Sequence, residues 1–414
     1  MLINKKFQIN KLLITILVLI SGILSAQEKK GTFKIQYNPN IIDSWWLEKN
    51  NFGVEPTNFD FGANWQLKKD DFTYSVNILF QEDQNYIGES FIKYNFSQKT
   101  FLRIGKYYRD FSSYLNNELS SGHMLVSQNA QPMSKVGLVS SYKIKKLKNI
   151  DFDFGVSHAV FDTNESYSKA PLLHEKFLYM NIKKNNYKFS IGLIHEAIWG
   201  GKTNDGRLPG NQPNSFKDFL KIIIAEDGPD EGGDHPNALG NHLGVTEFLF
   251  QKNDNNQVLK FYYQHFFEDT SGLRFRNEID GLWGIELNNY ISDVIFLLEY
   301  LHTTNQDMDP PYVDESYYNH GLYSKGWSYK NYTLGNSFIN HLNVEPINVL
   351  HMAISGTLLN YSYQIKTSRK TNINDQVKYR ININKKINPT NTIGIFIVNN
   401  DETIGIGANI SWIL

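Results

Sequence analysis

The chain has 414 residues, with 41 Lys and Arg against 42 Asp and Glu, no cysteine and 14% aromatic residues. The balanced charge argues against a nucleic-acid-binding protein, which would carry a basic patch. The missing cysteines exclude disulfides, thiolate metal sites and a lipoprotein anchor. An aromatic-rich, polar chain of this kind is typical of a membrane β-barrel.

The first 26 residues have the pattern of a cleaved signal peptide. Lys5, Lys6 and Lys11 precede an apolar run over 12–24, and Ser25 and Ala26 offer small residues for cleavage. The run is about 13 residues, shorter than the roughly 20 that a spanning helix needs. We therefore predict a signal peptide over 1–26 and a single outer-membrane β-barrel domain over 27–414.

The following segments alternate between apolar and polar residues. Over 72–78 the even positions are apolar and the odd positions polar, and 376–384 repeats the pattern with charges on its polar face. Successive side chains of a strand point to opposite faces. We expect Phe72, Tyr74, Val76 and Ile78 to face lipid.

Short and long connections alternate along the chain, as in outer-membrane barrels. Short polar turns are expected at 68–71, 97–99, 145–150, 184–186, 251–257 and 385–389, with a weaker one near 356–359. Long loops are expected at 109–134, 161–173, 196–243, 268–279 and 302–347. Counting from 32–38 to 403–413 gives 18 strands. The predicted fold is all-β, a transmembrane antiparallel outer-membrane β-barrel with long extracellular or lumen-occluding loops.

The last strand supports this interpretation. Ile404, Ile406, Ala408, Ile410, Trp412 and Leu414 share one face. In a soluble edge strand this apolar row would favour aggregation, whereas closure of a barrel removes the edge.

The two longest loops, 196–243 and 302–347, are expected either to plug the lumen or to build an external binding face. Tyr and Trp rings can stack on sugars, and Asn, His and Arg can bind hydroxyl groups. The candidate polysaccharide-binding residues are Trp199, Arg207, Tyr318, Asn319, His320, Tyr323 and Trp327. The alternative is that these aromatic residues form interfacial girdles or pack a plug.

Motifs for catalysis and metal binding are incomplete. His195 and Glu196 begin like a zinc-protease motif, but Trp199 stands where the second His is required. Four carboxylates lie close together in Asp227, Asp230, Glu231 and Asp234. They could hold Ca²⁺, but their spacing fits no EF-hand, so a solvated loop tip is preferred. We predict no enzymatic activity, no cofactor and no metal.

Several motifs in the loops resemble the Wzi-like capsule assembly family of outer-membrane proteins. The resemblance rests on Ser121-Gly122-His123-Met124, Ser127-Gln128-Asn129-Ala130-Gln131-Pro132, His195 with Trp199-Gly200-Gly201, Asn241-His242-Leu243-Gly244, the run from Tyr317 to Tyr323, Gly326-Trp327 and Gly335-Asn336. It implies an 18-stranded outer-membrane barrel that acts as a lectin and holds capsular polysaccharide on the cell surface.

Three functions remain open at this point. The first is a non-enzymatic barrel that binds and retains capsular or exopolysaccharide. The second is an outer-membrane diffusion porin for sugars or anionic solutes, and the third is an outer-membrane hydrolase. We favour them in that order. The expected partners are surface polysaccharide, outer-membrane lipid and the polysaccharide export machinery, with no nucleic acid, and we expect a monomer.

Overall fold

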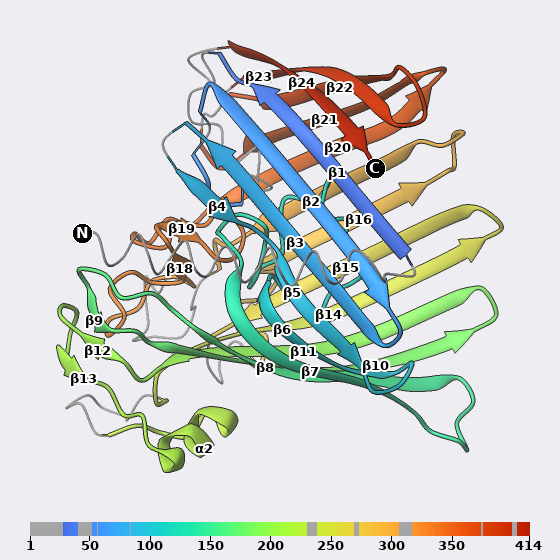
Figure 1. Cartoon of the computed structure of the whole chain (residues 1–414). Helices are drawn as coiled ribbons and strands as arrows, with labels where there is room; N and C mark the ends of the chain where they lie inside the picture. The colour runs from blue at the N-terminus through green and yellow to red at the C-terminus, as the bar shows by residue number, and fades with distance from the viewer. Residues whose placement is uncertain are drawn as a thin grey trace.

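Eighteen strand positions close into an antiparallel barrel in the computed structural model, which confirms the predicted fold (Figure 1). β1 pairs with β2 on one side and with the last strand, β24, on the other. β4 and β5 both pair with β3 and together occupy one position. The structure describes residues 28–39, 52–55, 57–82, 84–229, 238–268, 273–305, 317–373, 376–399 and 404–414. The predicted signal peptide lies outside them.

The barrel strands, in chain order, are β1 (Glu28–Tyr37), β2 (Phe59–Lys69), β3 (Phe72–Gln81), β4 (Asn85–Ile87), β5 (Ser90–Asn95), β6 (Thr100–Tyr107), β7 (Met133–Lys143), β8 (Ile150–Val160), β10 (Leu172–Lys184), β11 (Tyr187–Trp199), β14 (Asn241–Asp254), β15 (Gln257–Phe267), β16 (Gly281–Asn288), β17 (Ile295–His302), β20 (Asn348–Leu358), β21 (Tyr361–Lys370), β22 (Lys378–Lys386), β23 (Asn391–Asn399) and β24 (Ile404–Ile413). The loops add β9 (Tyr167–Lys169), β12 (Lys202–Thr203), β13 (Gly210–Asn211), β18 (Ser328–Tyr329), β19 (Tyr332–Thr333) and the helix α2 (Phe216–Ile224).

The long connections gather at one end of the barrel, on the left in Figure 1, and the short turns lie at the other. The structure confirms the expected short turns, at 70–71, 96–99, 144–149, 185–186, 255–256, 359–360 and 387–390. A further turn at 289–294 was not expected. The apolar Ile291 is 76% exposed at its tip, so hydropathy alone does not mark this turn.

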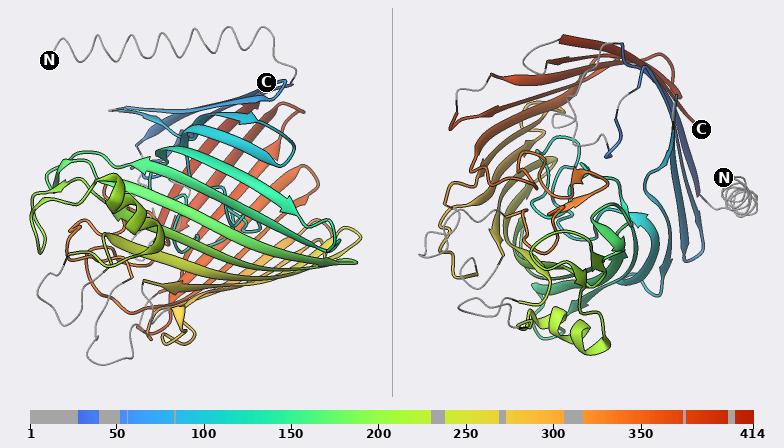
Figure 2. Two further views of the ribbon diagram at one scale, coloured as in Figure 1. Left: turned by 90° about the horizontal axis from the view of Figure 1, so that it is seen from below. Right: turned by 90° about the vertical axis from the view of Figure 1, so that its left-hand side faces the viewer.

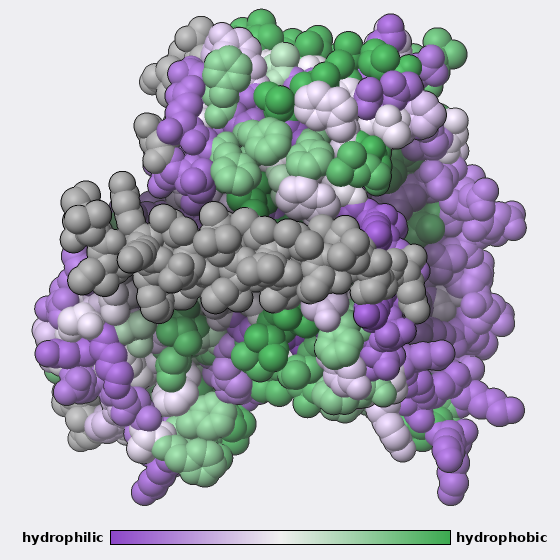
Figure 3. All heavy atoms as spheres, in the orientation of Figure 1, coloured by the Kyte–Doolittle hydropathy of each residue, from purple (hydrophilic) through white to green (hydrophobic). Residues whose placement is uncertain are grey.

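The outer surface of the barrel is apolar. Ser75 and Asn77 line cavities inside the barrel, so their neighbours Tyr74 and Val76 project outward, as predicted. Exposed apolar side chains continue round the wall, for example Ile35, Phe61, Leu138, Phe154, Leu178, Leu193, Phe261, Met352, Ile395 and Ile406. Figure 3 shows such residues over the upper part of the visible face, with hydrophilic residues at the right, where the short turns lie. This surface suits contact with hydrocarbon.

Aromatic residues mark the border of this apolar band near the short turns. They include Phe72, Tyr94, Phe96, Tyr142, Tyr187 and Tyr361, which lie within a few residues of a turn and are largely exposed or half-buried. Phe72 and Tyr94 pack with ring centroids 4.7 Å apart. Such rings sit at the boundary between hydrocarbon and water. Among the described residues, no helix combines the length and apolar character needed to cross a membrane.

Two long loops fold back into the lumen, and we call them the inner loops. The first inner loop covers residues 108–132 and the second covers 317–347. Their buried side chains join one core with inward residues of the wall, including Met124, Leu125, Tyr318 and Trp327 from the loops. Figure 2, right, shows the teal and orange loop segments within the outline of the barrel.

The helix α2 lies outside the barrel wall. Ser215 caps its first turn, because the Ser215 side chain accepts from the amide of Asp218 and the Asp218 carboxylate accepts from the amide of Ser215. Its inner face places Phe219 against Trp199, with ring centroids 5.5 Å apart. Phe216, whose ring centroid is 6.4 Å from that of Phe219, is 75% exposed.

The outward register of β3 can be tested by charge substitution. Val76→Arg should destabilise the assembled barrel by about 2–4 kcal/mol if residue 76 lies near the membrane midplane. Asn77→Arg is the matched control, because the neighbouring side chain faces the lumen. Heat-modifiable migration on a gel measures assembly. Normal migration of the Val76 variant would show that the register is incorrect.

Candidate functional site

The first inner loop is fastened to the wall at Glu247 of β14. This fully buried carboxylate accepts hydrogen bonds from Ser112 Oγ at 2.6 Å and from the Tyr179 hydroxyl at 2.6 Å, and its Oε1 lies 2.9 Å from His123 Nε2. His123 Nδ1 accepts from the amide of Leu125 at 2.9 Å, so Nε2 carries the proton that His123 donates to Glu247. Burying a carboxylate is tolerable only with such donors.

Further contacts hold the same loop along the wall. The amide of Ser121 donates to Glu299 of β17, and the amide of Met124 donates to the side-chain oxygen of Gln264 at 3.0 Å. His351 of β20 approaches the carbonyl of Leu119 at 2.7 Å. The loop is thus bound to several neighbouring strands, which fixes its path through the lumen.

The two inner loops are bound to each other. The amide of Ser127 donates to the carbonyl of Leu334 at 2.8 Å, and Asn129 Nδ2 donates to the carbonyl of Thr333 at 2.9 Å. Trp327 Nε1 donates to the carbonyl of Leu125 at 2.9 Å. Gly335 lies at the closest approach, where a Cβ atom would collide with the carbonyl of Met124. A side chain at 335 would therefore force the loops apart.

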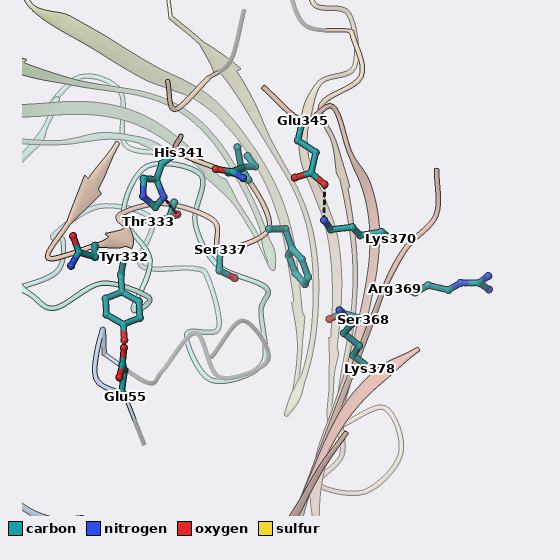
Figure 4. A pocket seen from close by; sticks show the side chains of 14 residues that line it. Glu55, Tyr332, Thr333, Ser337, His341, Glu345, Ser368, Arg369, Lys370 and Lys378 are labelled. Carbon is teal, nitrogen blue, oxygen red and sulfur yellow. Dashed lines mark hydrogen bonds and ion pairs between the residues drawn. The ribbon is translucent and has the colours of Figure 1, made fainter. Parts of the chain in front are cut away.

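A cavity of about 550 Å³ lies where the second inner loop meets the wall at β21 and β22, and we call it the mouth cavity (Figure 4). The loop supplies Tyr332, Ser337 and His341, and the wall supplies Lys370 and Lys378. Its lining therefore combines an aromatic ring, hydroxyl groups, an imidazole, cations and the carboxylates of Glu55 and Glu345. The volume is within the range of small-molecule sites.

Polar contacts order the mouth cavity. Thr333 Oγ1 lies 2.9 Å from His341 Nδ1, and Lys370 donates to Glu345 at 2.9 Å. In Figure 4, Lys370 and Lys378 extend from the wall on the side of the cavity, whereas Arg369 points away from it. Alternation along β21 explains this difference. The arrangement can bind a polar ligand through its hydroxyl and charged groups.

Four of the predicted binding residues are buried. Trp199 lies on the outer side of the wall, 7% exposed beneath α2. Tyr318, Tyr323 and Trp327 belong to the second inner loop and are at most 1% exposed. The Tyr323 hydroxyl donates to the carbonyl of Gly200 at 3.2 Å, and the Tyr318 hydroxyl donates to the carbonyl of Met124. These side chains pack the loops.

The other three predicted residues present polar groups nearer to the surface. Arg207 is exposed, and its amide donates to the carbonyl of Gly321 at 2.6 Å. Asn319 is half-buried and donates to the carbonyl of Leu342 at 2.7 Å. His320 is half-buried, with its ring centroid 5.7 Å from that of Tyr323.

His195 of the incomplete zinc-protease motif and three neighbouring histidines lie on the outer side of the wall. His195 Nε2 is 2.9 Å from His242 Nδ1, and the rings of His158 and His174 have centroids 5.0 Å apart. Within the described part of the chain, no three His, Asp or Glu side chains converge as a metal site would require.

Of the acidic cluster, Asp227 pairs with Ala238 through a β-bridge. Asp230, Glu231 and Asp234 lie outside the described residues.

Sequence reasoning missed the residues that line the mouth cavity. Tyr332, His341 and Glu345 lie within the predicted long loop, but Lys370 and Lys378 lie on two strands that the pattern assigns only to the wall. The alternation of β21 and β22 marks the inward face. It does not show which part of a distant loop would meet that face.

The geometry defines a class of protein. It is an outer-membrane β-barrel with an apolar outer wall, a lumen partly filled by its own loops and a polar cavity at the loop end. The model of the capsule assembly protein Wzi family matches residues 47–388, which is most of the chain. The chain belongs to this family, and the protein resides in the bacterial outer membrane.

The solved structures that the chain matches include outer-membrane porins. Pseudomonas aeruginosa OccK5 (OpdH) is 8% identical, with 94% of this chain and 98% of that chain covered and a TM-score of 0.43. Salmonella typhi OmpF in complex with daunomycin is 8% identical, with 94% and 97% covered and a TM-score of 0.41. A multiply substituted mutant of the Rh. blastica porin is 9% identical, with 93% and 98% covered and a TM-score of 0.40. No curated protein matches the chain.

Removing the Glu247 carboxylate should release the first inner loop. Glu247→Ala leaves His123, Ser112 and Tyr179 without their acceptor, so the free energy of unfolding should fall by about 3–5 kcal/mol. Glu165→Ala is the control, because the Glu165 side chain is 80% exposed in its pair with Lys325 and should change stability by about 0–1 kcal/mol. Urea titration of tryptophan fluorescence measures both. Equal stability of the two variants would contradict the anchoring role.

The second inner loop should lose stability in acid. Burial and the Arg207 guanidinium lower the pKa of His320 to about 4, and burial and Lys325 lower the pKa of His341 to about 4. In the unfolded chain the pKa of His is about 6.5, so the unfolded chain binds a proton at each of these histidines before the folded chain does as the pH falls. Stability is therefore full above about pH 6.5 and declines as the pH falls toward about 4.

The midpoint of urea unfolding should accordingly move to lower urea between pH 7.5 and pH 4.5. A double variant, His320→Gln with His341→Gln, should show a smaller change over the same interval, because both titrating groups are gone. If the urea midpoint of the double variant moves as far as that of the parent protein, other residues cause the acid sensitivity.

Proposed function

We propose that the protein binds capsular or exopolysaccharide at the cell surface and retains it there without a catalytic step. Membership of the capsule assembly family supports a polysaccharide as the ligand. The mouth cavity is the observation that carries the proposal, because it lies at the end of the barrel where the long loops gather and combines groups that suit saccharides.

The chemistry of the mouth cavity fits a sugar unit. The Tyr332 ring offers an apolar face, and Ser337, His341 and Asn340 offer donors and acceptors for hydroxyl groups. Lys378 suits a carboxylate on an acidic unit, whereas Lys370 already donates to Glu345. Each contact is worth about 0.5–1.5 kcal/mol.

Retention of a long polymer does not require tight binding of one unit. A polymer presents many copies of its repeat, so a released unit is replaced by a neighbour at high effective concentration. The partly exposed polar groups of Arg207, Asn319 and His320 extend the proposed contact along the loop surface. The buried Tyr318, Tyr323 and Trp327 support this surface from below.

The test is the ratio of cell-attached to released polysaccharide. Tyr332→Ala combined with Lys378→Ala should shift polymer into the released fraction at constant total, by about fivefold or more if two contacts are lost. Arg369→Ala is the control. Arg369 is next to Lys370 on β21, but its side chain points away from the mouth cavity. Heat-modifiable migration verifies folding. An unchanged ratio in the folded double variant would overturn the proposal.

A second candidate function is diffusion of sugars or anionic solutes through the barrel. Cavities along β1–β3 and β21–β22, on the side of the lumen away from the first inner loop's anchors, favour it. Single-channel conductance of the purified barrel separates the two functions. Steady conductance with an unchanged polymer ratio would favour the channel.

A further inference from the structure

The outward side chains of β10 and β11 change from exposed to buried part of the way along the strands. Leu193 of β11 is 46% exposed on the lipid-facing side, whereas His195, the next outward residue toward the loop end, is 9% exposed. On β10, which pairs with β11, Leu178 is 51% exposed and His174 is buried. Side chains of a strand share a face at every second position, so another element covers the outer wall beyond Leu193 and Leu178.

The covering element is the helix α2. Figure 2, right, shows α2 outside the ring of barrel strands. The Phe219 ring of α2 has its centroid 5.6 Å from that of His174 and 5.5 Å from that of Trp199. Lys176 of β10 donates to the carbonyl of Ile223 in the last turn of the helix. Both ends of α2 are thus held against outward side chains of the wall.

The covered part of the wall lies within the height of the membrane. A strand needs ~9–11 residues to cross the hydrocarbon, and that length, counted from Tyr187 beside its short turn, ends at 195–197 on β11. Lys176 is one outward position from the lipid-facing Leu178, which is about 7 Å along the strand. The helix therefore lies level with the outer edge of the apolar band, at the end of the barrel where the long loops gather.

α2 also carries a row of apolar side chains that the described residues leave uncovered. Phe216, Leu220 and Ile224 follow one another at intervals of four residues, which places them along one side of the helix. They are 75%, 48% and 69% exposed. Figure 3 shows hydrophobic side chains at the lower left, where Figure 1 places α2. The cation of Lys217 is exposed beside this row.

The position of this row favours lipid as its partner. A contiguous exposed apolar patch marks an interaction site. The row adjoins the outer wall, whose exposed residues such as Leu178 and Leu193 already face hydrocarbon, so the two form one continuous apolar surface. An amphipathic helix with a lysine beside its apolar side is typical of helices that lie in the membrane interface, with the ammonium group toward the headgroups.

We infer that α2 lies in the outer leaflet of the membrane, with Phe216, Leu220 and Ile224 inserted among the lipid chains close to the headgroups. In this position the helix completes the apolar band over a part of the wall that itself carries His174 and His195. It also attaches the long loop between β11 and β14 to the membrane surface. This contact does not depend on the polysaccharide, so it is separate from the proposed function.

Quenching by nitroxide-labelled lipid tests this contact directly. The chain has no cysteine, so Phe216→Cys and Ile224→Cys each allow a nitrobenzoxadiazole label at a single position of the full-length barrel. The labelled protein is placed in phosphatidylcholine nanodiscs that hold a single barrel. Interfacial helices lie about 5–10 Å deep, so nitroxides near the headgroup end of the lipid chain should quench both labels at least about twofold more than nitroxides near the chain end. Iodide in the water should quench them weakly.

Leu193→Cys and Glu165→Cys are the matched controls. Leu193 faces lipid on the wall below α2, so nitroxides should quench its label. The Glu165 side chain is 80% exposed in a loop, so iodide should quench its label. Labels on α2 that behave like the Glu165 label would overturn the lipid contact. Labels shielded from both iodide and nitroxide would show that protein covers the row, and this result would overturn it as well.

A charge within the row should withdraw α2 from the lipid. Leu220→Asp leaves Phe219 and its contacts with the wall in place, but a carboxylate is costly to bury in hydrocarbon. Iodide quenching of the label at Ile224→Cys should therefore rise at least about twofold. Lys217→Asp is the control, because residue 217 lies beside the row and should leave the quenching nearly unchanged. Heat-modifiable migration verifies assembly. Equal iodide quenching with Leu220 and with Asp at position 220 would contradict insertion.

Discussion

Buried carboxylates on the inner wall need hydrogen-bond donors, and this need determines how the first inner loop packs inside the barrel. Glu175, Glu247, Glu286 and Glu299 project from β10, β14, β16 and β17 into a buried core. Lys135 and Ser157 donate to Glu175, and Lys260 donates to Glu286. The first inner loop supplies donors to Glu247 and Glu299. The loop and the wall therefore stabilise each other, because either one alone would leave charged or polar groups without partners.

This requirement divides the lumen into two unlike halves. The half that carries the buried carboxylates is filled by the inner loops and their apolar core. The opposite half, formed by β1–β3 and β21–β22, carries Lys34, Lys366 and Arg380 and borders cavities. The first half is thus closely packed, whereas the second retains open volume. A uniform water-filled pore would show no such difference.

The second inner loop connects this packing to the outer surface. Its buried residues, among them Tyr318 and Trp327, hydrogen-bond to the first inner loop, and its last part forms one side of the mouth cavity. A ligand in the mouth cavity therefore contacts a loop that is fixed by its own core. Little conformational entropy remains to be lost on binding, which favours weak but repeated contacts with a polymer.

The sequence alone determined the barrel, because a period of two, the alternation of short and long connections and an even strand count all follow from local pattern. Phe72, Val76 and the row ending at Leu414 could be assigned to the outer face in this way. The site could not, because it depends on contacts between distant segments. Trp199 and Trp327 have side chains suited to sugars, yet tertiary packing buries one beneath α2 and the other between the inner loops. Lys366 and Arg380 meet only through the register of β21 and β22, which the pattern of either strand alone does not show.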